Sequence, residues 1–394
     1  MPSKRRLYLG LLVALNVAGI YALASHAAKS SGYAPAFPDQ KNAPALVTTP
    51  VQVETLRTDL AQPWGMAFLP DGRLLMTEKA GRLLLFSADF QQRQILARVP
   101  HVRDVGQGGL LDVAFLAGSK PHICVSFAEA RGGDKSGTSV ACGRWVDGAA
   151  PQLLDLRVIW RQQPAWDSAG HYGSRLVPME NGPLFVTTGE RQDKAARPFA
   201  QRLDATLGKV IRIHSDGRIP QDNPFVGRAK AQGEIWSYGH RNLQGAALDA
   251  QGRLWTLEHG PRGGDELNRP QAGKNYGWPV ISYGIEYSGA PVSAGITQHQ
   301  GMEQPVYYWD PVIGPSGMVF YNGKAFPAWQ GDILIGGLVS QGLVRLKLHQ
   351  DRVVGEERIA LDARIRDVAE GPDGFVYLIT DAAPGALLRL RPKN

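Results

Sequence analysis

The hydrophobic pattern of this chain repeats a short unit: an apolar strand, a tight Asp-Gly or Asn-Gly turn, and a second apolar strand ending near an acidic residue or Thr. Asp-Gly between alternating apolar segments is the strongest short-range signal for a β-hairpin. Clear copies span residues 66–79, 175–190, 246–260 and 368–381, and weaker copies span 109–127 and 318–337. No long run has the period of an amphipathic helix. The chain is therefore predicted to be all-β.

Six copies over about 345 residues give about 57 residues per unit, the size of a four-stranded propeller blade with its loops. Individual hairpins of this kind also occur in β-sandwiches, but the regular spacing favours radial repetition, which protects strand edges. We predict a six-bladed β-propeller with four-stranded antiparallel blades over residues 51–394. Functional residues should then lie at equivalent places in different blades, because loops from every blade converge on the axis.

Residues 1–28 have the features of a signal peptide or an N-terminal anchor. Lys4, Arg5 and Arg6 form a charged region, and an apolar stretch from Leu7 to Ala24 follows. With roughly 18 apolar residues the stretch is at the lower limit for spanning a bilayer, so cleavage and anchoring both stay open. Residues 29–50, rich in Ala, Pro and Ser, are predicted to be a flexible linker. We expect a periplasmic or secreted protein that meets a membrane only through an uncleaved N-terminal segment.

The formal net charge of +7 is compatible with a nucleic acid, an anionic surface or an anionic small molecule as partner. Basic residues outside the N-terminus form no runs, so no nucleic-acid partner is expected. The two cysteines, Cys124 and Cys142, lie in strand-like segments joined by a polar turn. A disulfide and a pair of buried thiols are both consistent with this placement.

The segment 235–287 holds the densest group of unusual residues. Glu258, Asp265 and Glu266 could supply the hard oxygen ligands that calcium takes, and the neighbouring glycines let backbone carbonyls turn toward a ligand. A solvated turn often has the same composition. On these residues alone, metal binding is one of two interpretations.

An ordered set of motifs carries a family resemblance: PWGMAFLPDG, GQGGLLDVAF, HYGSRL, GKVIRI with DGRIPQDNPF, GHRNLQG, EHGPRGGDELN, GKNYGWP, GPSGMVFY and RIRDVAEGPDG. In these motifs the chain resembles the soluble quinoprotein glucose dehydrogenases and the aldose sugar (glucose/sorbosone) dehydrogenases. The resemblance implies that pyrroloquinoline quinone (PQQ), held by Ca²⁺ on the propeller axis, accepts hydride from the anomeric carbon of an aldose, which becomes a lactone. Electrons would pass to a periplasmic acceptor, and a monomer or homodimer is expected.

The same resemblance assigns the reaction centre. His171, in AGHYGSRL, matches the family's general base for the anomeric hydroxyl, a role that suits an imidazole with an ordinary pKa near 6.5. Gln107, in GQGGLL, matches a residue beside both sugar and quinone. Arg241 and Asn242, in GHRNLQG, match the pair beside the reactive quinone carbonyl, where a fixed cation stabilises developing negative charge.

Three further arginines are predicted to bind the cofactor. Arg364 and Arg366, in ARIRD, match residues that fork onto cofactor carboxylates, and strand alternation puts both on one face. Arg191, in TTGER, lies where the aldose sugar branch has Arg and the glucose branch has Gln. Asp265 corresponds to an acidic group close to the sugar or cofactor and is the predicted substrate residue.

Metal ligands are also implied by the resemblance. Gly260 and Pro261 match the carbonyl donors to the calcium that bridges protein and quinone, and Glu266 and Tyr276 match ligands of a second, structural calcium.

Two departures from the glucose dehydrogenase pattern concern specificity and affinity. Gly170, rather than Asp, precedes the predicted base, and Ser340 and Gln341 stand where a cofactor-binding Lys is usual.

Two other functions fit the predicted fold. A calcium-dependent propeller hydrolase, such as a lactonase, needs Asn, Asp and Glu ligands from several blades and a metal-bound water, whereas this sequence places Arg and Gln in those loops. A non-catalytic sugar- or ligand-binding propeller would keep the fold without the chemistry. The presence of His171 together with the four matched Arg and Asn residues argues against it.

Overall fold

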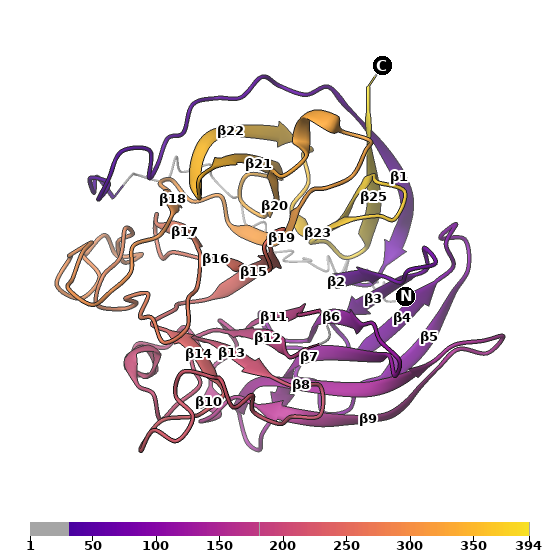
Figure 1. Ribbon diagram of the computed structural model, residues 1–394, viewed down its shortest axis with the longest axis horizontal. Helices are drawn as coiled ribbons and strands as arrows, with labels where there is room; N and C mark the ends of the chain where they lie inside the picture. Colours follow the sequence, from indigo (N-terminus) through magenta and orange to yellow (C-terminus); the bar gives the residue numbers. More distant parts are fainter. Residues whose placement is uncertain (1–30, 181, 394) are drawn as a thin grey trace, which may run out of the picture.

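The computed structural model describes residues 31–180 and 182–393, whose strands form six antiparallel sheets arranged in a ring (Figure 1). Each sheet is one blade. No α-helix occurs within these described residues, which include two short 3-10 helices, η1 (Arg197–Gln201) and η2 (Pro327–Trp329). The predicted six-bladed β-propeller is therefore confirmed.

The blades follow one another along the chain. The first blade contains β2 (Pro63–Phe68), β3 (Leu74–Glu78), β4 (Arg82–Phe86) and β5 (Arg93–Arg98). The second contains β6 (Leu110–Leu116), β7 (His122–Ala130), β8 (Lys135–Val146), β9 (Gln152–Arg161) and the short β10 (Trp166–Asp167). The third contains β11 (Gly173–Pro178), β12 (Leu184–Thr188), β13 (Lys209–Ile213) and β14 (Ile235–Tyr238). The fourth blade contains β15 (Leu243–Leu248), β16 (Leu254–Glu258), β17 (Asp265–Asn268) and β18 (Tyr307–Trp309). The fifth contains β19 (Pro315–Phe320), β20 (Ile333–Gly337), β21 (Gly342–His349) and β22 (Arg352–Ala360). The sixth contains β23 (Ile365–Glu370), β24 (Val376–Thr380), β25 (Gly385–Pro392) and β1 (Val51–Leu60).

The ring of blades is closed by pairing between strands from the two ends of the chain segment that forms the propeller. Strand β1 pairs antiparallel with β25, so the first strand of the chain completes the last blade. The first strand of each hairpin unit lies innermost, and these strands contact one another in turn around the axis: β2, β6, β11, β15, β19 and β23. Their ends therefore bring residues that are far apart in sequence to one place on the axis.

Asp-Gly turns join the first and second strands of two blades as the repeat predicted. Gly72 and Gly374 have φ of 89° and 78°, a left-handed conformation that glycine adopts without strain. The preceding Asp71 and Asp373 accept hydrogen bonds from the amides two residues later.

The hydrophobic core lies mainly between blades rather than inside one sheet. Each gap between neighbouring blades holds its own cluster of buried side chains, for example Leu75 with Val125 between the first two blades. The other gaps are filled in the same way. Alternating apolar residues on both faces of each blade explain why the repeat predicted the fold.

The described part of the predicted linker, residues 31–50, packs against the fifth blade and the neighbouring edge of the fourth. Gln40 is fully buried, and its side chain donates to the Pro305 carbonyl at 2.9 Å. Leu46 donates from its amide to the Glu356 carbonyl at 2.8 Å. The prediction of a flexible linker is wrong for these residues, because composition alone did not reveal their partners in distant blades.

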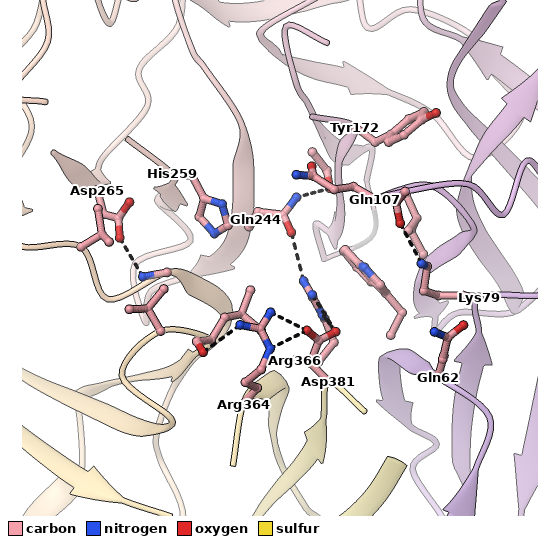
Figure 2. A pocket seen from close by; sticks show the side chains of 18 of the residues that line it. Gln62, Lys79, Gln107, Tyr172, Gln244, His259, Asp265, Arg364, Arg366 and Asp381 are labelled. Carbon is pink, nitrogen blue, oxygen red and sulfur yellow. Dashed lines mark hydrogen bonds and ion pairs between the residues drawn. The ribbon is translucent and has the colours of Figure 1, made fainter. Parts of the chain in front are cut away.

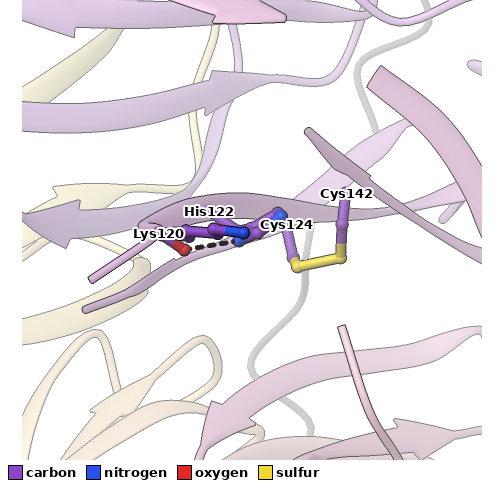
Figure 3. The surroundings of a disulfide bond; sticks show 4 residues. All are labelled: Lys120, His122, Cys124 and Cys142. Atoms are coloured by element: carbon purple, nitrogen blue, oxygen red, sulfur yellow. Dashed lines mark hydrogen bonds between the residues drawn. A yellow bond between two sulfur atoms is a disulfide. The ribbon is translucent and has the colours of Figure 1, made fainter. Parts of the chain in front are cut away.

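A disulfide joins Cys124 of β7 to Cys142 of β8 (Figure 3). The residues are directly opposite each other in the antiparallel ladder, with Cα atoms 4.1 Å apart. Of the two alternatives that the sequence left open, the structure has the disulfide.

The predicted signal or anchor lies outside the described residues. In the part of the chain that the structure does describe, no helix is long and apolar enough to cross a membrane.

Candidate functional site

A cavity of about 660 Å³ opens at one end of the propeller axis, and all six blades contribute to its wall (Figure 2). Its polar lining includes Gln62, Lys79, Gln107, Tyr172, Gln244, His259, Asp265, Arg364, Arg366 and Asp381. This convergence on the axis is what the repeat predicted. A cavity of this size suits a small molecule that is largely surrounded by protein.

His171 is buried beside this cavity and is held by two partners. Its Nδ1 lies 3.0 Å from Oε1 of Glu190, and its backbone amide donates to Oε1 of Gln107 at 2.8 Å. Because a carboxylate can only accept, Nδ1 carries the hydrogen and Nε2 has the lone pair. The structure thus brings together two of the predicted residues, His171 and Gln107, and adds Glu190 as the group that orients the imidazole.

The backbone at His171 is also unusual. Its φ of 46° is left-handed, which is uncommon for a residue with a side chain and occurs often at functional sites. A Cβ on Gly189 would lie 2.1 Å from the His171 carbonyl oxygen, so only glycine fits the facing strand end. The close approach explains how Glu190, the next residue, reaches the imidazole.

Burial lowers the pKa of His171 to about 4, and the nearby charge of Arg241 acts in the same direction, while Glu190 opposes it. The imidazole is therefore neutral at physiological pH. This pKa lies below the ordinary imidazole value near 6.5, so the neutral form that a base requires is present over a wider pH range.

Arg241 and Asn242 are buried next to the same region. The Nη1 of Arg241 donates to the carbonyls of His259 and Gly260 at 2.9 and 2.8 Å, and its backbone amide donates to Glu258 at 2.7 Å. Two donors, Nε of Arg241 and Nδ2 of Asn242, are buried without a partner. Unpaired buried donors are costly, and these two are available to a group bound beside them.

Arg364 and Arg366 line the cavity from the last blade and share one carboxylate (Figure 2). Asp381 lies 2.7 Å from Nη2 of Arg364 and 2.8 Å from Nη2 of Arg366. Burial alone would raise the pKa of Asp381, but the two guanidinium groups outweigh it and lower the pKa. With two cations and one anion, this cluster keeps a net positive charge that can bind an anion.

Arg191 has a different position from the one predicted for a cofactor ligand. It is fully buried, its guanidinium lies 3.5 Å from the centre of the Tyr172 ring, and its Nη atoms donate to Ser136 and to the carbonyls of Ser168 and His171. It is not part of the cavity wall, although Tyr172 is. Arg191 therefore supports Tyr172 and His171 from behind rather than presenting a free charge to a ligand.

Asp265 lines the cavity, but backbone amides already occupy its oxygens. Oδ1 accepts from Gly260 at 2.9 Å, and Oδ2 accepts from Ile313 and Gly314 at 2.9 and 2.8 Å. Burial raises its pKa to about 6. Asp265 therefore fixes two loops at the axis while it lines the cavity, and its predicted role toward the substrate stays a prediction.

The predicted carbonyl ligands for calcium lie at the cavity. Gly260 and Pro261 both line it, and the Gly260 carbonyl, with that of His259, already turns toward a cation, the guanidinium of Arg241. Backbone carbonyls are among the ligands that calcium takes, so the residue types of this turn fit a calcium ion, which would share the Gly260 carbonyl with Arg241.

Glu266 lies beside Glu258, and burial together with this second carboxylate raises its pKa well above the usual value. Asn268 donates to both carboxylates, and its own Oδ1 is buried without a partner. The Glu266 carboxylate and the unpaired amide oxygen of Asn268 are ligand types that calcium takes, whereas Glu258 already accepts from His240, Arg241 and Asn268. Within the described residues no group of three or more His, Cys, Asp and Glu side chains could hold a metal, so a calcium here also needs amide or carbonyl oxygens.

Tyr276, the other predicted ligand of the second calcium, uses its hydroxyl elsewhere. The hydroxyl donates to the Arg269 carbonyl at 2.7 Å, and the ring stacks on His240 at 4.8 Å. His240 in turn lies 2.9 Å from Glu258 and from Ser237. This buried Ser–His–Glu chain holds Arg241 through Glu258 and is closed to solvent, so it cannot serve as a hydrolase triad.

The two departures noted in the sequence have structural counterparts. A Cβ on Gly170 would lie 2.0 Å from Oε1 of Gln192, so the Gln192 side chain fills the place that a larger residue before the base would need. Ser340 has a buried hydroxyl with no partner. Lys79 supplies a cation to the cavity wall from a different blade, where its Nζ donates to the Gly106 carbonyl at 3.0 Å.

Several site residues were missed by sequence reasoning: Lys79, Glu190, Gln244, His259 and Asp381. Glu190 and Asp381 had a signal in the sequence, because they are the acidic residues that end a repeat. Strand ends of the repeat face the axis, so these carboxylates were candidates by position alone. His259 follows the same rule one residue after Glu258, and its Nε2 lies 2.7 Å from the Pro315 carbonyl.

The fold and the site define a six-bladed propeller with a cationic axial cavity beside a buried histidine–glutamate pair. The comparisons with known proteins agree with this class. Residues 60–389 match the sequence model of the glucose/sorbosone dehydrogenase family, and the chain belongs to that family of oxidoreductases.

Three relatives illustrate the match. The aldose sugar dehydrogenase YliI of Escherichia coli is 43% identical over 87% of this chain and 94% of its own length. A crystal structure of the soluble aldose sugar dehydrogenase from Escherichia coli in the apo-form has a TM-score of 0.81 at 42% identity, covering 87% of this chain and 100% of that one. The PQQ-bound aldose sugar dehydrogenase of Streptomyces coelicolor has a TM-score of 0.69 at 27% identity, covering 87% and 99%.

Proposed function

We propose that this protein oxidises the anomeric carbon of aldose sugars to lactones with PQQ as hydride acceptor and Ca²⁺ as the ion that holds the quinone. The observation that carries the proposal is a neutral, oriented His171 buried beside a cavity whose wall holds a net-positive arginine cluster. The first suits proton abstraction, and the second suits an anionic cofactor.

In this proposal His171 accepts the proton of the anomeric hydroxyl at Nε2, while Glu190 stabilises the resulting imidazolium through Nδ1. The anomeric carbon loses hydride in the same oxidation, so the sugar gives up two electrons and becomes a lactone. PQQ, when bound, supplies the acceptor for that hydride. Gln107 holds the backbone of the base at the edge of the cavity.

The arginines would have different electrostatic roles toward the cofactor. Arg364 and Arg366 would bind the carboxylates of the cofactor, which are ionised before and after the reaction. Arg241 and Asn242 would offer their unpaired donors, Nε and Nδ2, to the group where negative charge develops. Gly260 and Pro261 would provide carbonyl oxygens to calcium, which balances the charge of the polyanion.

The names of the relatives support aldose sugars as the substrate and PQQ as the cofactor. YliI and the Streptomyces protein are called aldose sugar dehydrogenases, and the second was solved in a PQQ-bound form. We extend both properties to this chain as part of the proposal.

We further propose that the protein works in the periplasm or outside the cell and passes electrons to an acceptor there, as a monomer or homodimer. The disulfide between Cys124 and Cys142 supports this location, because such bonds persist mainly in oxidising compartments.

The test is an activity assay on purified protein with a panel of aldoses and an artificial electron acceptor, before and after adding PQQ and Ca²⁺. The proposal predicts lactone formation only when both are added. A parallel assay with a lactone substrate checks the calcium-dependent hydrolase alternative. Lactone hydrolysis without sugar oxidation would replace the proposal, and no activity with either substrate would favour a binding propeller.

A further inference from the structure

The cavity wall contains an unusual pair of exposed apolar side chains. Among the large hydrophobic residues that are exposed in the described part of the chain, two line this cavity: Tyr287, 65% exposed, and Val339, 55% exposed. Tyr287 comes from the long loop between β17 and β18, and Val339 from the turn between β20 and β21. Both therefore reach the same space from neighbouring blades.

The turn that carries Tyr287 is held firmly at its base. The amide of Glu286 donates to the Ala290 carbonyl at 2.8 Å, and Gly289 donates back to the Glu286 carbonyl at 2.8 Å. Ile285 and Arg262 exchange backbone hydrogen bonds of 2.9 and 3.0 Å. Tyr287 thus occupies the tip of a closed turn and does not depend on its own side chain for its position.

An ion pair ties this turn to the reaction centre. Glu286 pairs with both Nη atoms of Arg197, whose guanidinium lies 5.2 Å from the centre of the Trp278 ring. Arg241 lies at the same distance from that ring centre. The hydrogen bond from Arg197 lowers the pKa of Glu286, and the charges of Arg197, Lys194 and Arg241 act in the same direction against the opposing effect of burial. The base of the turn is therefore linked to Arg241 through Arg197 and the Trp278 ring that both guanidinium groups approach.

A pyranose ring has hydroxyl groups at its edge and apolar C–H faces. The polar cavity wall can bind the hydroxyls, but a C–H face is best covered by a flat apolar group. The cavity wall mixes polar and apolar residues, and of its aromatic residues Trp64 and Tyr172 are buried, whereas Tyr287 is exposed. A single ring and one valine are too small a surface for a stable protein partner, which favours a small molecule as the occupant.

We propose that Tyr287, assisted by Val339, is the platform on which the pyranose ring of the substrate lies, and that it determines sugar affinity. This inference rests on the proposed function and assigns its sugar-binding side. Because the contact is made equally before and during the reaction, it contributes to sugar binding and not to the saturated rate.

The test compares Tyr287→Ala, Tyr287→Phe and the control Ile296→Ala in the quinone- and calcium-loaded protein. Ile296 is an exposed hydrophobic residue of the same loop that is not part of the cavity wall. Tyr287→Ala should raise the KM for an aldopyranose about five- to tenfold, because roughly 40–50 Å² of apolar surface would no longer be buried on sugar binding. The kcat and the quinone affinity should stay near wild type. Tyr287→Phe and Ile296→Ala should change the sugar KM less than about twofold.

Sugar binding is also measured by calorimetry, independently of turnover. An unchanged sugar affinity in Tyr287→Ala would overturn the inference. A changed KM for the electron acceptor with an unchanged KM for the sugar would also overturn it and would assign the surface to the acceptor. Absence of sugar oxidation in every protein, including wild type, would instead refute the proposed function, while weaker sugar binding by Tyr287→Ala alone would still support the platform.

Discussion

Two arginine–aspartate clusters lie along the propeller axis, and their charge balance is opposite. At the cavity, Arg364 and Arg366 share Asp381. Farther along the axis, Arg175 lies between two carboxylates, 3.2 Å from Asp112 and 2.9 Å from Asp367. The first cluster has one positive charge in excess when its groups are ionised, and the second has one negative charge in excess.

The surroundings of the clusters differ as well. Arg175 is buried, and its remaining nitrogens donate to the carbonyls of Gln244 and Arg366. Its carboxylate partners also accept backbone amides, and burial raises the pKa of Asp112 to about 6. By contrast, the Arg364 side chain is 48% exposed and borders the cavity. The same residue types thus stabilise the ring when their charges satisfy one another, and in the proposed function they bind an anionic cofactor when one cation is in excess.

The largest effect is expected at the buried cluster. Replacing Arg175 with Met leaves two buried carboxylates without their cation, so the free energy of unfolding should fall by about 3–5 kcal/mol. Chemical denaturation measures this change. The matched control, Arg364→Met, should change stability by less than about 1 kcal/mol because its ion pair is largely solvated. Equal losses in the two variants would show that both clusters are structural.

A second prediction concerns the orientation of the base. Glu190→Gln removes the carboxylate that fixes the hydrogen on Nδ1 of His171, so kcat should fall about 10- to 100-fold while quinone affinity stays near wild type. Steady-state kinetics and quinone titration separate the two quantities. Glu303→Gln, at a surface ion pair with Lys274, is the control and should keep full turnover. An unchanged kcat in Glu190→Gln would remove this residue from the reaction.

A third prediction concerns the affinity for quinone of the cluster at the cavity, which contains Arg364 and Arg366. Arg366→Ala should weaken quinone binding about 10- to 100-fold, and Arg364→Ala less, because the Arg366 side chain is only 12% exposed. Both variants should recover most of their turnover at saturating quinone, since these contacts persist throughout the reaction. Lys at either position should restore binding only in part. A low saturated rate in either variant would contradict a role limited to binding.

The smallest effect is expected from pH. Since the pKa of His171 is about 4, its base form predominates above that value and is lost as the pH falls through it. Between pH 7.5 and 5.5, protonation of His171 should therefore change kcat/KM less than about twofold. A rate profile with its acidic midpoint near 6.5 would mean that the imidazole is not held as the structure indicates.

The fold could be predicted well from the sequence because a propeller repeats one local pattern of strands and turns. The Asp-Gly turns at Gly72 and Gly374 and the alternating strands specify hairpins, and their spacing specifies the number of blades. The packing of residues 31–50 was not predicted, because Gln40 finds its partner 265 positions away. Composition carries no information on such a contact.

The site was predicted in part for a similar reason. The motifs located His171, Gln107 and the arginine pair, all of which lie at or beside the cavity. They could not show that Arg191 turns inward onto Tyr172 or that backbone amides occupy Asp265. These orientations depend on the closure of the ring, which brings together loops from different blades. Glu190 and Asp381 were overlooked because an acidic residue at a strand end acquires a partner only in the assembled propeller.

The central claim is that proton abstraction is carried by His171 beside the cavity and cofactor binding by different residues in the cavity wall. Single-turnover reduction of bound quinone by sugar, followed by absorbance in His171→Gln, tests it most directly. The account predicts quinone binding close to wild type and a reduction rate about 10²- to 10⁴-fold lower, as expected for loss of a general base. A near-normal reduction rate, or loss of quinone binding as the main defect, would contradict it.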